Sequence, residues 1–229
     1  MRLNSIIYEN FYPDPFLIRN KLLKQEFYPA DYLHDTIRTE ELDNDDVVEI
    51  SKIGNFCGER TIRASKILPE ADEYTRTFVN QYCKFSDETK LEVDTYFTLQ
   101  TKDHDNVNKS IHQDTDPIMA IVVYLTPNPE PNSGTVFYSH KKTGWNGINK
   151  DRVPDLAFKD MYPANRQDQN KDNFEVDSVV GNAFNRIVLY DSKLLHAPGT
   201  CFGDTKEDCR LTQTSVSYTH LTLPTILLV

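Results

Sequence analysis

From residue 90 onward the sequence is a series of short β-rich segments separated by turn residues. This series limits the chain to an architecture of many short antiparallel strands, because closely spaced strands with turn signals between them favour a sandwich or barrel. The first segment alternates polar and apolar residues, and the second is a continuous apolar run typical of a buried strand. The segments in order are LEVDTYFTLQ, MAIVVYL, GTVFY, FEVDSVV, NRIVLY, LLHAPG and CRLTQT.

The first 89 residues predict helices instead. Asp14 is a suitable N-cap and Pro15 a suitable first helical residue, and apolar residues at helical spacing predict a second helix over 69–84. Residues 29–66 are mostly polar and predict irregular structure, and we interpret the acidic run EELDNDDVVE as a solvated loop. The expected fold is α+β and mainly β, with N-terminal helices packed on one sheet of a β sandwich or barrel.

A chain of 229 residues with 38% hydrophobic residues suits one domain with a real core. We expect that domain to span 1–214, with a helical or irregular layer over 1–89 and a β core over 90–214. The polar segment 139–175 interrupts the strands, and its length favours a functional lid over a passive connector. Within it, His140 and Trp145 either line a substrate mouth or pack inside the loop.

The charge and the targeting features limit the partners. A formal net charge of −10 makes binding to a nucleic-acid backbone unlikely, because that binding depends on Lys and Arg. No apolar run approaches the roughly 20 residues of a membrane span, and the N-terminus does not read as a secretory leader. The four cysteines form no C-x-x-C motif, which favours thiols in a reducing compartment and therefore a cytoplasmic protein. Nothing in the sequence indicates an oligomeric state.

His112 and Asp114 form an H-x-D pair in the stretch IHQDTDP. Two histidines and one carboxylate hold Fe(II) on one face of an octahedron in non-haem oxygenases, which leaves positions open for substrates. The second histidine must come from a strand beside the first pair, and His196 in LYDSKLLHAPG is the candidate, 84 positions after His112. A single buried histidine is more often a core residue, so the metal site is predicted only from the three residues taken together.

Arg210 and Thr212 follow in CRLTQT, 14 and 16 positions after His196. Residues i and i+2 share a face of a strand, and a guanidinium beside a hydroxyl suits a carboxylate at the floor of a pocket. The alternative is an ordinary ion pair between Arg210 and a surface acid.

The order of these motifs resembles the Fe(II)/2-oxoglutarate-dependent oxygenases, in particular the prolyl-hydroxylase-like branch of the double-stranded β-helix fold. The resemblance covers residues 90–214 and includes NSGTVFY, which is similar to that branch's glycine-rich turn into a core strand. The opening NFYPDPFLIR is similar to the helical entry of small phage and bacterial proteins of this type.

The resemblance implies that His112, Asp114 and His196 bind Fe(II) and form the catalytic centre. It also implies a dioxygenase that uses O2 and 2-oxoglutarate, hydroxylates a C–H bond and releases succinate and CO2. The expected substrate is a small molecule or a peptide. The expected location is the cytoplasm of a bacterium or a phage-infected cell.

The resemblance further implies a binding site for the cosubstrate 2-oxoglutarate. Arg210 would pair with its distal carboxylate and Thr212 would hydrogen-bond to it. Tyr124, on the strand after the H-x-D pair, and Tyr96, on the strand before it, are the further candidate donors, although a buried tyrosine often serves packing alone.

The C-terminal stretch VSYTHLTLPT, residues 216–225, resembles one translated reading frame of a transposase-based sequencing adapter. We therefore expect residues 215–229 to be a non-native tail and assign no function to Tyr218 or His220.

Two other functions stay open. One is a cupin-like metalloenzyme that keeps the three metal ligands but does not use 2-oxoglutarate, with Arg210 in a structural role. The other is a non-catalytic β-sandwich binding or virion-associated module in which the three residues coincide by chance.

Overall fold

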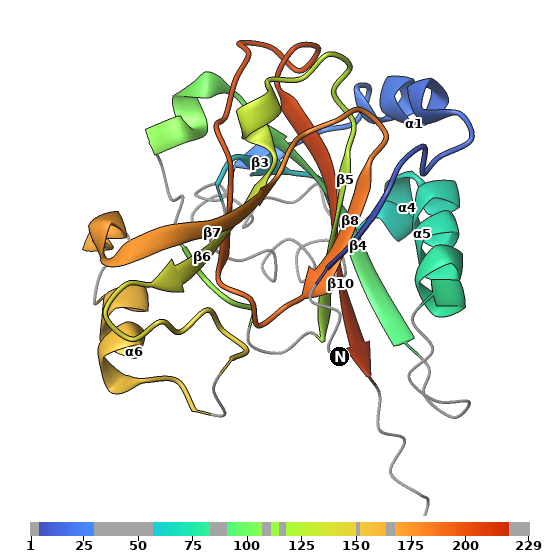
Figure 1. Cartoon of the computed structure of the whole chain (residues 1–229). Helices are drawn as coiled ribbons and strands as arrows, with labels where there is room; N and C mark the ends of the chain where they lie inside the picture. Colours follow the sequence, from blue (N-terminus) through green and yellow to red (C-terminus); the bar gives the residue numbers. More distant parts are fainter. Residues whose placement is uncertain are drawn as a thin grey trace, which may run out of the picture.

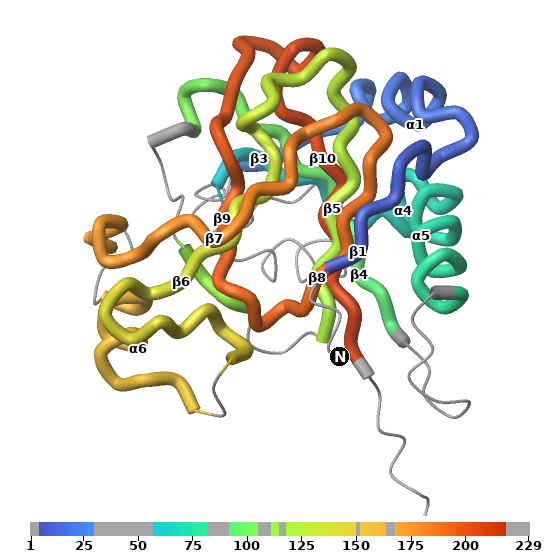
Figure 2. Tube along the Cα trace, viewed as in Figure 1, coloured from blue at the N-terminus to red at the C-terminus, as the bar shows by residue number. Residues whose placement is uncertain are grey.

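Two antiparallel sheets form the body of the protein (Figures 1 and 2). The larger has seven strands in the order β1-β8-β5-β10-β4-β3-β2, and the smaller has three in the order β7-β6-β9. The computed structural model describes residues 5–29, 57–82, 91–106, 111–114, 118–149, 152–163 and 168–219. The acidic run EELDNDDVVE lies outside the described residues.

The strand bounds agree with the β-rich segments of the sequence. The larger sheet contains β1 (Ser5–Tyr8), β2 (Tyr28–Pro29), β3 (Glu59–Arg60), β4 (Leu91–Gln100), β5 (Met119–Tyr124), β8 (Ile187–Asp191) and β10 (Arg210–Thr219). The smaller sheet contains β6 (Thr135–His140), β7 (Phe174–Val180) and β9 (His196–Pro198).

The two sheets face each other across a shared core. Side chains from both sheets meet there, among them Tyr124 and Tyr190 from the larger sheet and Phe137 and Val180 from the smaller. An isolated bridge between His112 and His196 extends the smaller sheet beyond β9. The result is a double-stranded β-helix with helices on one sheet, which confirms the expected fold class.

Strand β5 is buried along its whole length because both of its faces are covered. Met119, Ile121 and Val123 pack in the core beneath the helices, whereas Ala120 and Val122 point into the space between the sheets. Alternate residues of a strand point to opposite faces, so two covered faces require the continuous apolar run seen in the sequence.

Strands β4 and β10 instead have one apolar and one polar face. Phe97, Leu99 and Leu211 are buried in the helix-side core. Their neighbours Thr98 and Thr212 project to the inner face, between the two sheets, where they pair in register. The interior of the double-stranded β-helix is therefore polar along these two strands.

Helices cover the outer face of the larger sheet (Figure 1). They are α1 (Pro15–Leu22), α4 (Ala64–Ile67) and α5 (Pro69–Tyr82). The Asp14 side chain accepts a hydrogen bond from the Leu17 backbone N–H at 2.9 Å, so Asp14 caps α1 as the sequence predicts. Helix α5 begins at the predicted residue, Pro69. The described part of the chain contains no helix long and apolar enough to cross a membrane.

The prediction of irregular structure over 29–66 is wrong for its last part. Strand β3 and helix α4 lie there, and β3 pairs with β4 through Arg60 and Thr98. A two-residue strand has no readable periodicity, so only its pairing with β4 reveals it.

Strand β10 continues to Thr219 and therefore includes the first residues of the expected non-native tail. Ser217 pairs with Val93 of β4 and Met119 of β5. The non-native origin of residues 215–229 stays a prediction.

The remaining short elements include three 3-10 helices, η1 (Lys102–Asn106), η2 (Pro131–Ser133) and η4 (Lys171–Asn173), and helix α6 (Asp155–Met161). Helix α6 belongs to the 139–175 insertion, and its Ala157 and Met161 pack with Phe174 of β7 and Ala197 of β9.

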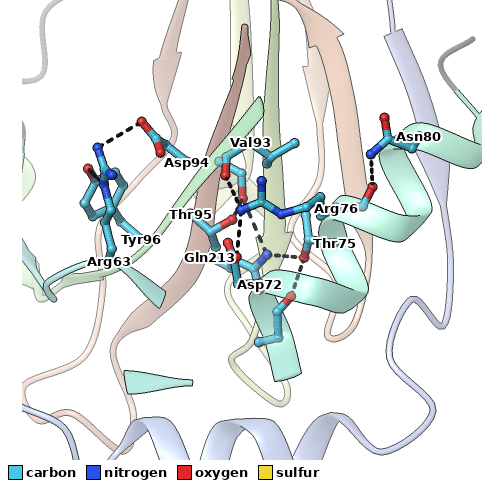
Figure 3. A network of polar contacts seen from close by, with 12 residues as sticks. Arg63, Asp72, Thr75, Arg76, Asn80, Val93, Asp94, Thr95, Tyr96 and Gln213 are labelled. Carbon is cyan, nitrogen blue, oxygen red and sulfur yellow. Dashed lines mark hydrogen bonds and ion pairs between the residues drawn. The ribbon is translucent and has the colours of Figure 1, made fainter. Parts of the chain in front are cut away.

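A chain of buried hydrogen bonds joins the helical layer to the larger sheet. The Tyr12 hydroxyl donates to the Gln213 Oε1, and the Gln213 amide donates to the Thr75 Oγ1 at 2.6 Å. The Thr75 hydroxyl in turn donates to the Ala71 carbonyl at 2.8 Å. Figure 3 shows the Gln213 side chain, which comes from β10, directed toward Thr75 of α5. These bonds satisfy polar groups inside an apolar layer.

We expect Tyr12→Phe to lower the free energy of unfolding by about 1–3 kcal/mol, because the buried Gln213 oxygen loses its donor. Urea denaturation should show a lower midpoint with an unchanged slope. The control is Tyr138→Phe, a half-buried tyrosine, which should change stability by less than about 0.5 kcal/mol. Equal effects of the two variants would contradict the assignment.

Candidate metal centre

His112 and His196 are joined by two backbone hydrogen bonds. The His112 N–H donates to the His196 carbonyl at 3.0 Å, and the His196 N–H donates to the His112 carbonyl at 2.8 Å. Residues paired in this way project their side chains to the same face, and the two imidazole rings lie 4.4 Å apart between centroids. The backbone therefore brings together two histidines that are far apart in the sequence.

Asp114 completes a cluster of three possible metal ligands. Its backbone N–H donates to the Ser192 carbonyl at 2.9 Å, in the turn between β8 and β9. Its carboxylate oxygens lie 3.8 Å from the His112 Nε2 and 3.9 Å from the His196 Nε2. One ligand atom from each of the three residues lies within 4.8 Å of the others. Ligand bonds of about 2.1 Å to one ion need separations of this order, so the cluster fits a divalent metal.

The surroundings of His196 keep its imidazole neutral and oriented. Burial, and next the neighbouring His112, lower the pKa of His196 to about 4, against the opposing effect of Asp114. Its Nδ1 lies 2.8 Å from the Leu194 carbonyl, which can only accept, so Nδ1 carries the proton. Nε2 therefore keeps its lone pair, which is the state a metal ligand requires.

The three candidate ligands are not equally exposed. The His196 side chain is 7% exposed, whereas those of His112 and Asp114 are 32% and 26% exposed. Tyr190 covers the His196 side, and its ring lies 4.9 Å from that of His196. The cluster is therefore more exposed at His112 and Asp114 than at His196.

The 139–175 insertion supports the backbone beside the ligands. The Gln169 side chain accepts a hydrogen bond from the Ile111 N–H at 2.7 Å and donates to the Ile111 carbonyl at 2.8 Å. On the other strand, the Leu195 N–H donates to the Asn146 carbonyl at 2.9 Å. The insertion thus holds the residue immediately before each histidine ligand.

His140 and Trp145 do not line a mouth, because both are fully buried. The His140 Nε2 lies 2.9 Å from the Asp160 carboxylate, and its Nδ1 lies 2.9 Å from the Thr143 hydroxyl. Trp145 packs with Met161 of α6. Of the two alternatives left open by the sequence, these residues follow the packing one.

Arg210 lies at the start of β10 with its side chain buried. It donates to the Ser133 carbonyl, the Gln100 side-chain oxygen and, at 3.1 Å, the Gly134 carbonyl. All three acceptors are neutral, and Arg210 forms no ion pair within the described part of the chain. A buried guanidinium is costly without an anion, so this environment suits a bound carboxylate.

Tyr124 and Thr212 lie beside Arg210 on the inner face. The Arg210 guanidinium carbon is 5.8 Å from the Tyr124 ring centroid, and the Tyr124 hydroxyl is 2.8 Å from the Thr135 hydroxyl. Burial raises the pKa of Tyr124, while Arg210 lowers it, so the phenol stays protonated and able to donate. Thr212 pairs in register with Tyr124.

Tyr96 lies on the same inner face but beside other arginines. It pairs with Thr214 of β10, and its hydroxyl accepts from the Arg63 Nε at 3.3 Å. The Arg60 guanidinium carbon lies 5.8 Å from its ring centroid. The sequence grouped Tyr96 with the Arg210 site, whereas the structure places it next to Arg60 and Arg63.

Tyr190 is the residue that the sequence interpretation missed. Burial, and next the charge of Asp114, raise its pKa well above the ordinary value, and its ring lies 4.9 Å from that of His196 and 5.1 Å from that of Phe137. The sequence did offer a signal for it. Val188 and Tyr190 are two residues apart on β8 and therefore point to the same face, which is the inner one.

The family of unknown function DUF6445 matches residues 51–215. The chain belongs to this family. No curated protein matches it.

Solved structures share the fold. HygX from Streptomyces hygroscopicus with nickel and 2-oxoglutarate bound is 15% identical, with a TM-score of 0.51 over 95% of this chain and 83% of that chain. The iron-bound form of HygX is 13% identical, with a TM-score of 0.50 and the same coverage. A prolyl-4-hydroxylase from Pseudomonas putida is 13% identical, with a TM-score of 0.47 over 95% of this chain and 93% of that chain. Identities this low show the double-stranded β-helix alone.

We expect Gln169→Met to weaken binding of a divalent metal by about 10-fold or more, because the backbone beside His112 loses both of its side-chain partners. Titration with Ni(II), followed by calorimetry, measures the affinity. The matched control Gln25→Met removes an amide that makes one long hydrogen bond, 3.4 Å, within its own helix end. An unchanged Ni(II) affinity in folded Gln169→Met would show that the insertion does not support the ligands.

Proposed function

We propose that this protein is an Fe(II)- and 2-oxoglutarate-dependent dioxygenase. The observation that carries the proposal is the convergence of His112, Asp114 and His196 in a double-stranded β-helix whose interior also holds a buried arginine without an acidic partner among the described residues. Two imidazoles and one carboxylate form the ligand set of non-haem Fe(II) oxygenases. HygX, which shares the fold, binds iron and 2-oxoglutarate.

Each residue has a defined part in the proposal. His112, Asp114 and His196 hold Fe(II). Arg210 pairs with the distal carboxylate of 2-oxoglutarate, and Thr212 and Tyr124 hydrogen-bond to it. With O2, such a centre oxidises a C–H bond of the substrate and converts 2-oxoglutarate to succinate and CO2.

The protein contributes geometry and exclusion of water. The neutral His196 and the backbone pairing with His112 hold two ligands before the metal arrives, which lowers the reorganisation needed on binding. The ring of Tyr190, itself packed on Phe137, closes the apolar side of the centre. The primary substrate, a small molecule or a peptide, approaches from the side of His112 and Asp114.

An anaerobic titration of Fe(II) in the presence of 2-oxoglutarate tests the proposal. We expect the visible charge-transfer band of the Fe(II)–2-oxoglutarate chelate in the parent protein and its loss in His112→Ala. The control is His104→Ala, because His104 bonds within its own loop to Thr101 and lies outside the cluster. No band in a folded parent sample would refute the use of 2-oxoglutarate.

Arg210→Lys should require about 10- to 100-fold more 2-oxoglutarate for the same band, because it loses the bidentate geometry of a charge-assisted pair. Arg152→Lys is the control, since the Arg152 side chain is 88% exposed. An unchanged 2-oxoglutarate requirement in folded Arg210→Lys would assign Arg210 a structural role. Stoichiometric metal binding without any chelate band in the parent protein would instead favour a cupin-like metalloenzyme.

We expect the aerobic protein, supplied with Fe(II) and with ascorbate as the two-electron reductant in place of a primary substrate, to form succinate slowly from 2-oxoglutarate, and Asp114→Ala to abolish this. Chromatographic quantification of succinate with and without Fe(II) measures it. A sample that binds no stoichiometric metal and forms no succinate would favour the non-catalytic binding or virion-associated module.

A further inference from the structure

A pocket of about 210 Å³ lies on the outer face of the smaller sheet, away from the space between the two sheets. Two of its lining residues, Val136 of β6 and Ala197 of β9, pair in register and therefore project to the same side. Ala197 packs with residues of α6 outside the sheet, whereas Phe137, the next residue of β6, packs in the core between the sheets. Figure 1 shows β6, β7 and α6 together, on the other side of the molecule from α1, α4 and α5.

The floor of this outer pocket is apolar and belongs to the backbone that carries two candidate metal ligands. Ile111 and Ala197 line it, and both are buried. Ile111 immediately precedes His112, and Ala197 immediately follows His196. Neighbouring residues of an extended chain point to opposite faces. A ligand in the outer pocket and a metal at the histidines would therefore lie on opposite sides of the same backbone.

One wall of the outer pocket is fixed by main-chain contacts. The Gly199 N–H donates to the Gly134 carbonyl at 2.8 Å, and the Thr200 N–H donates to the Asn132 carbonyl at 3.0 Å. A Cβ at Gly199 would collide with the Asn132 carbonyl, so glycine allows the two segments to approach each other this closely. The wall is thus held in place without the side chains of Asn132 and Thr200.

Polar side chains of the lining are left without protein partners within the described part of the chain. They are Asn132, Tyr138, Lys171 and Thr200. Tyr138 is half-buried, and burial raises its pKa, so its hydroxyl stays protonated and able to donate. Lys171 of η4 is exposed and forms no ion pair with any described residue. An apolar floor with a few unpaired polar groups is typical of a small-molecule site.

Charge and shape limit the class of ligand. Lys171 is the one charged residue among the described lining residues, so the pocket is locally cationic in a chain of net charge −10. Val176 and Val179 of β7 pair with Tyr138 and Val136 and extend the apolar face beside the pocket, and they are 57% and 51% exposed. The volume is below the roughly 300 Å³ of pockets for drug-sized ligands, so the ligand must be compact.

We propose that the outer pocket is a binding site for a compact organic carboxylate with an apolar body. The apolar body rests on Ile111, Val136 and Ala197, Lys171 pairs with the carboxylate, and the Tyr138 hydroxyl donates to it. This inference goes beyond the proposed function, because none of these residues holds the metal or 2-oxoglutarate. The ligand is therefore a different compound from the one that the metal centre would oxidise.

The first test uses benzoate as the probe and follows the backbone amide signals of the metal-free full chain by NMR. We expect saturable shifts at Ile111, Gly199 and Thr200, with a dissociation constant on the order of 1 mM or below, as suits a ligand of so few atoms. The signals of Tyr124 and Thr212, beside Arg210, should not follow that binding curve. Benzamide, the neutral analogue of similar shape, should bind about 3- to 5-fold more weakly, because it lacks the charge that Lys171 attracts.

The second test removes the two polar partners of the carboxylate. Lys171→Gln should weaken benzoate binding by about 3- to 5-fold and leave benzamide binding unchanged, since the effect of an exposed charge is modest. Tyr138→Phe should weaken benzoate binding by about 5-fold through the loss of one hydrogen bond. Both changes remove groups without protein partners, so folding should be retained. The control is Lys24→Gln, an exposed lysine just after α1, which should change neither affinity.

Three results would overturn the inference. One is the absence of any saturable shift up to about 20 mM benzoate. Another is equal benzoate affinity in the parent and in Lys171→Gln. The third is a set of shifts confined to the surroundings of Arg210 and abolished by Arg210→Lys, which would place benzoate in the proposed cosubstrate site. The titration needs no metal, so failure of the proposed function, seen as a missing chelate band, is distinguishable from failure of this inference.

Discussion

Two backbone hydrogen bonds between His112 and His196 are the constraint on which the candidate site depends. They place two imidazoles on one face of the smaller sheet, and Asp114 follows two residues later with its own backbone bond to the β8–β9 turn. The main chain therefore fixes where the three ligand residues lie, and the Leu194 carbonyl orients the His196 ring. Gln169 and Asn146 support the residues next to the two histidines, so the insertion strengthens this pairing from outside the sheet.

The two faces of the larger sheet differ in character: one is apolar and stabilises the fold, and the other is polar along β4 and β10 and holds candidate site residues. The helix-side face is apolar and holds residues such as Phe97 and Leu211, whose burial favours folding. The inner face of β4 and β10 is polar and would cost free energy to bury if its groups had no partners. Pairs such as Thr98 with Thr214 and Tyr124 with Thr135 satisfy those groups. The helix-side core thus allows a polar interior that an isolated sheet would not maintain.

The local charge of the interior differs from the charge of the whole chain. The net charge of −10 argues against a nucleic-acid backbone as partner, yet three arginines face the inside of the double-stranded β-helix. Among the described residues, the hydrogen-bond partners of Arg210 are all neutral groups, and Arg63 pairs with Asp94. An acidic chain thus encloses a buried guanidinium at Arg210, which local packing and not the overall charge determines.

The strand series, the capped start of α1 and the order of the candidate ligands were predictable without a structure. Those features are periodicities or short spacings, so they can be read along the chain. The continuous apolar run predicts that β5 is buried on both faces, and the i, i+2 spacing predicts that Arg210 and Thr212 lie on the same face of their strand. Which distant residues meet depends instead on how the strands pair and pack. Arg60 and Arg63 lie in a segment without periodicity and gain their place only because β3 pairs with β4. Tyr96 belongs with them, Tyr190 covers His196, and Trp145 is buried, because cross-strand register and packing between segments depend on the whole fold and leave no local signal.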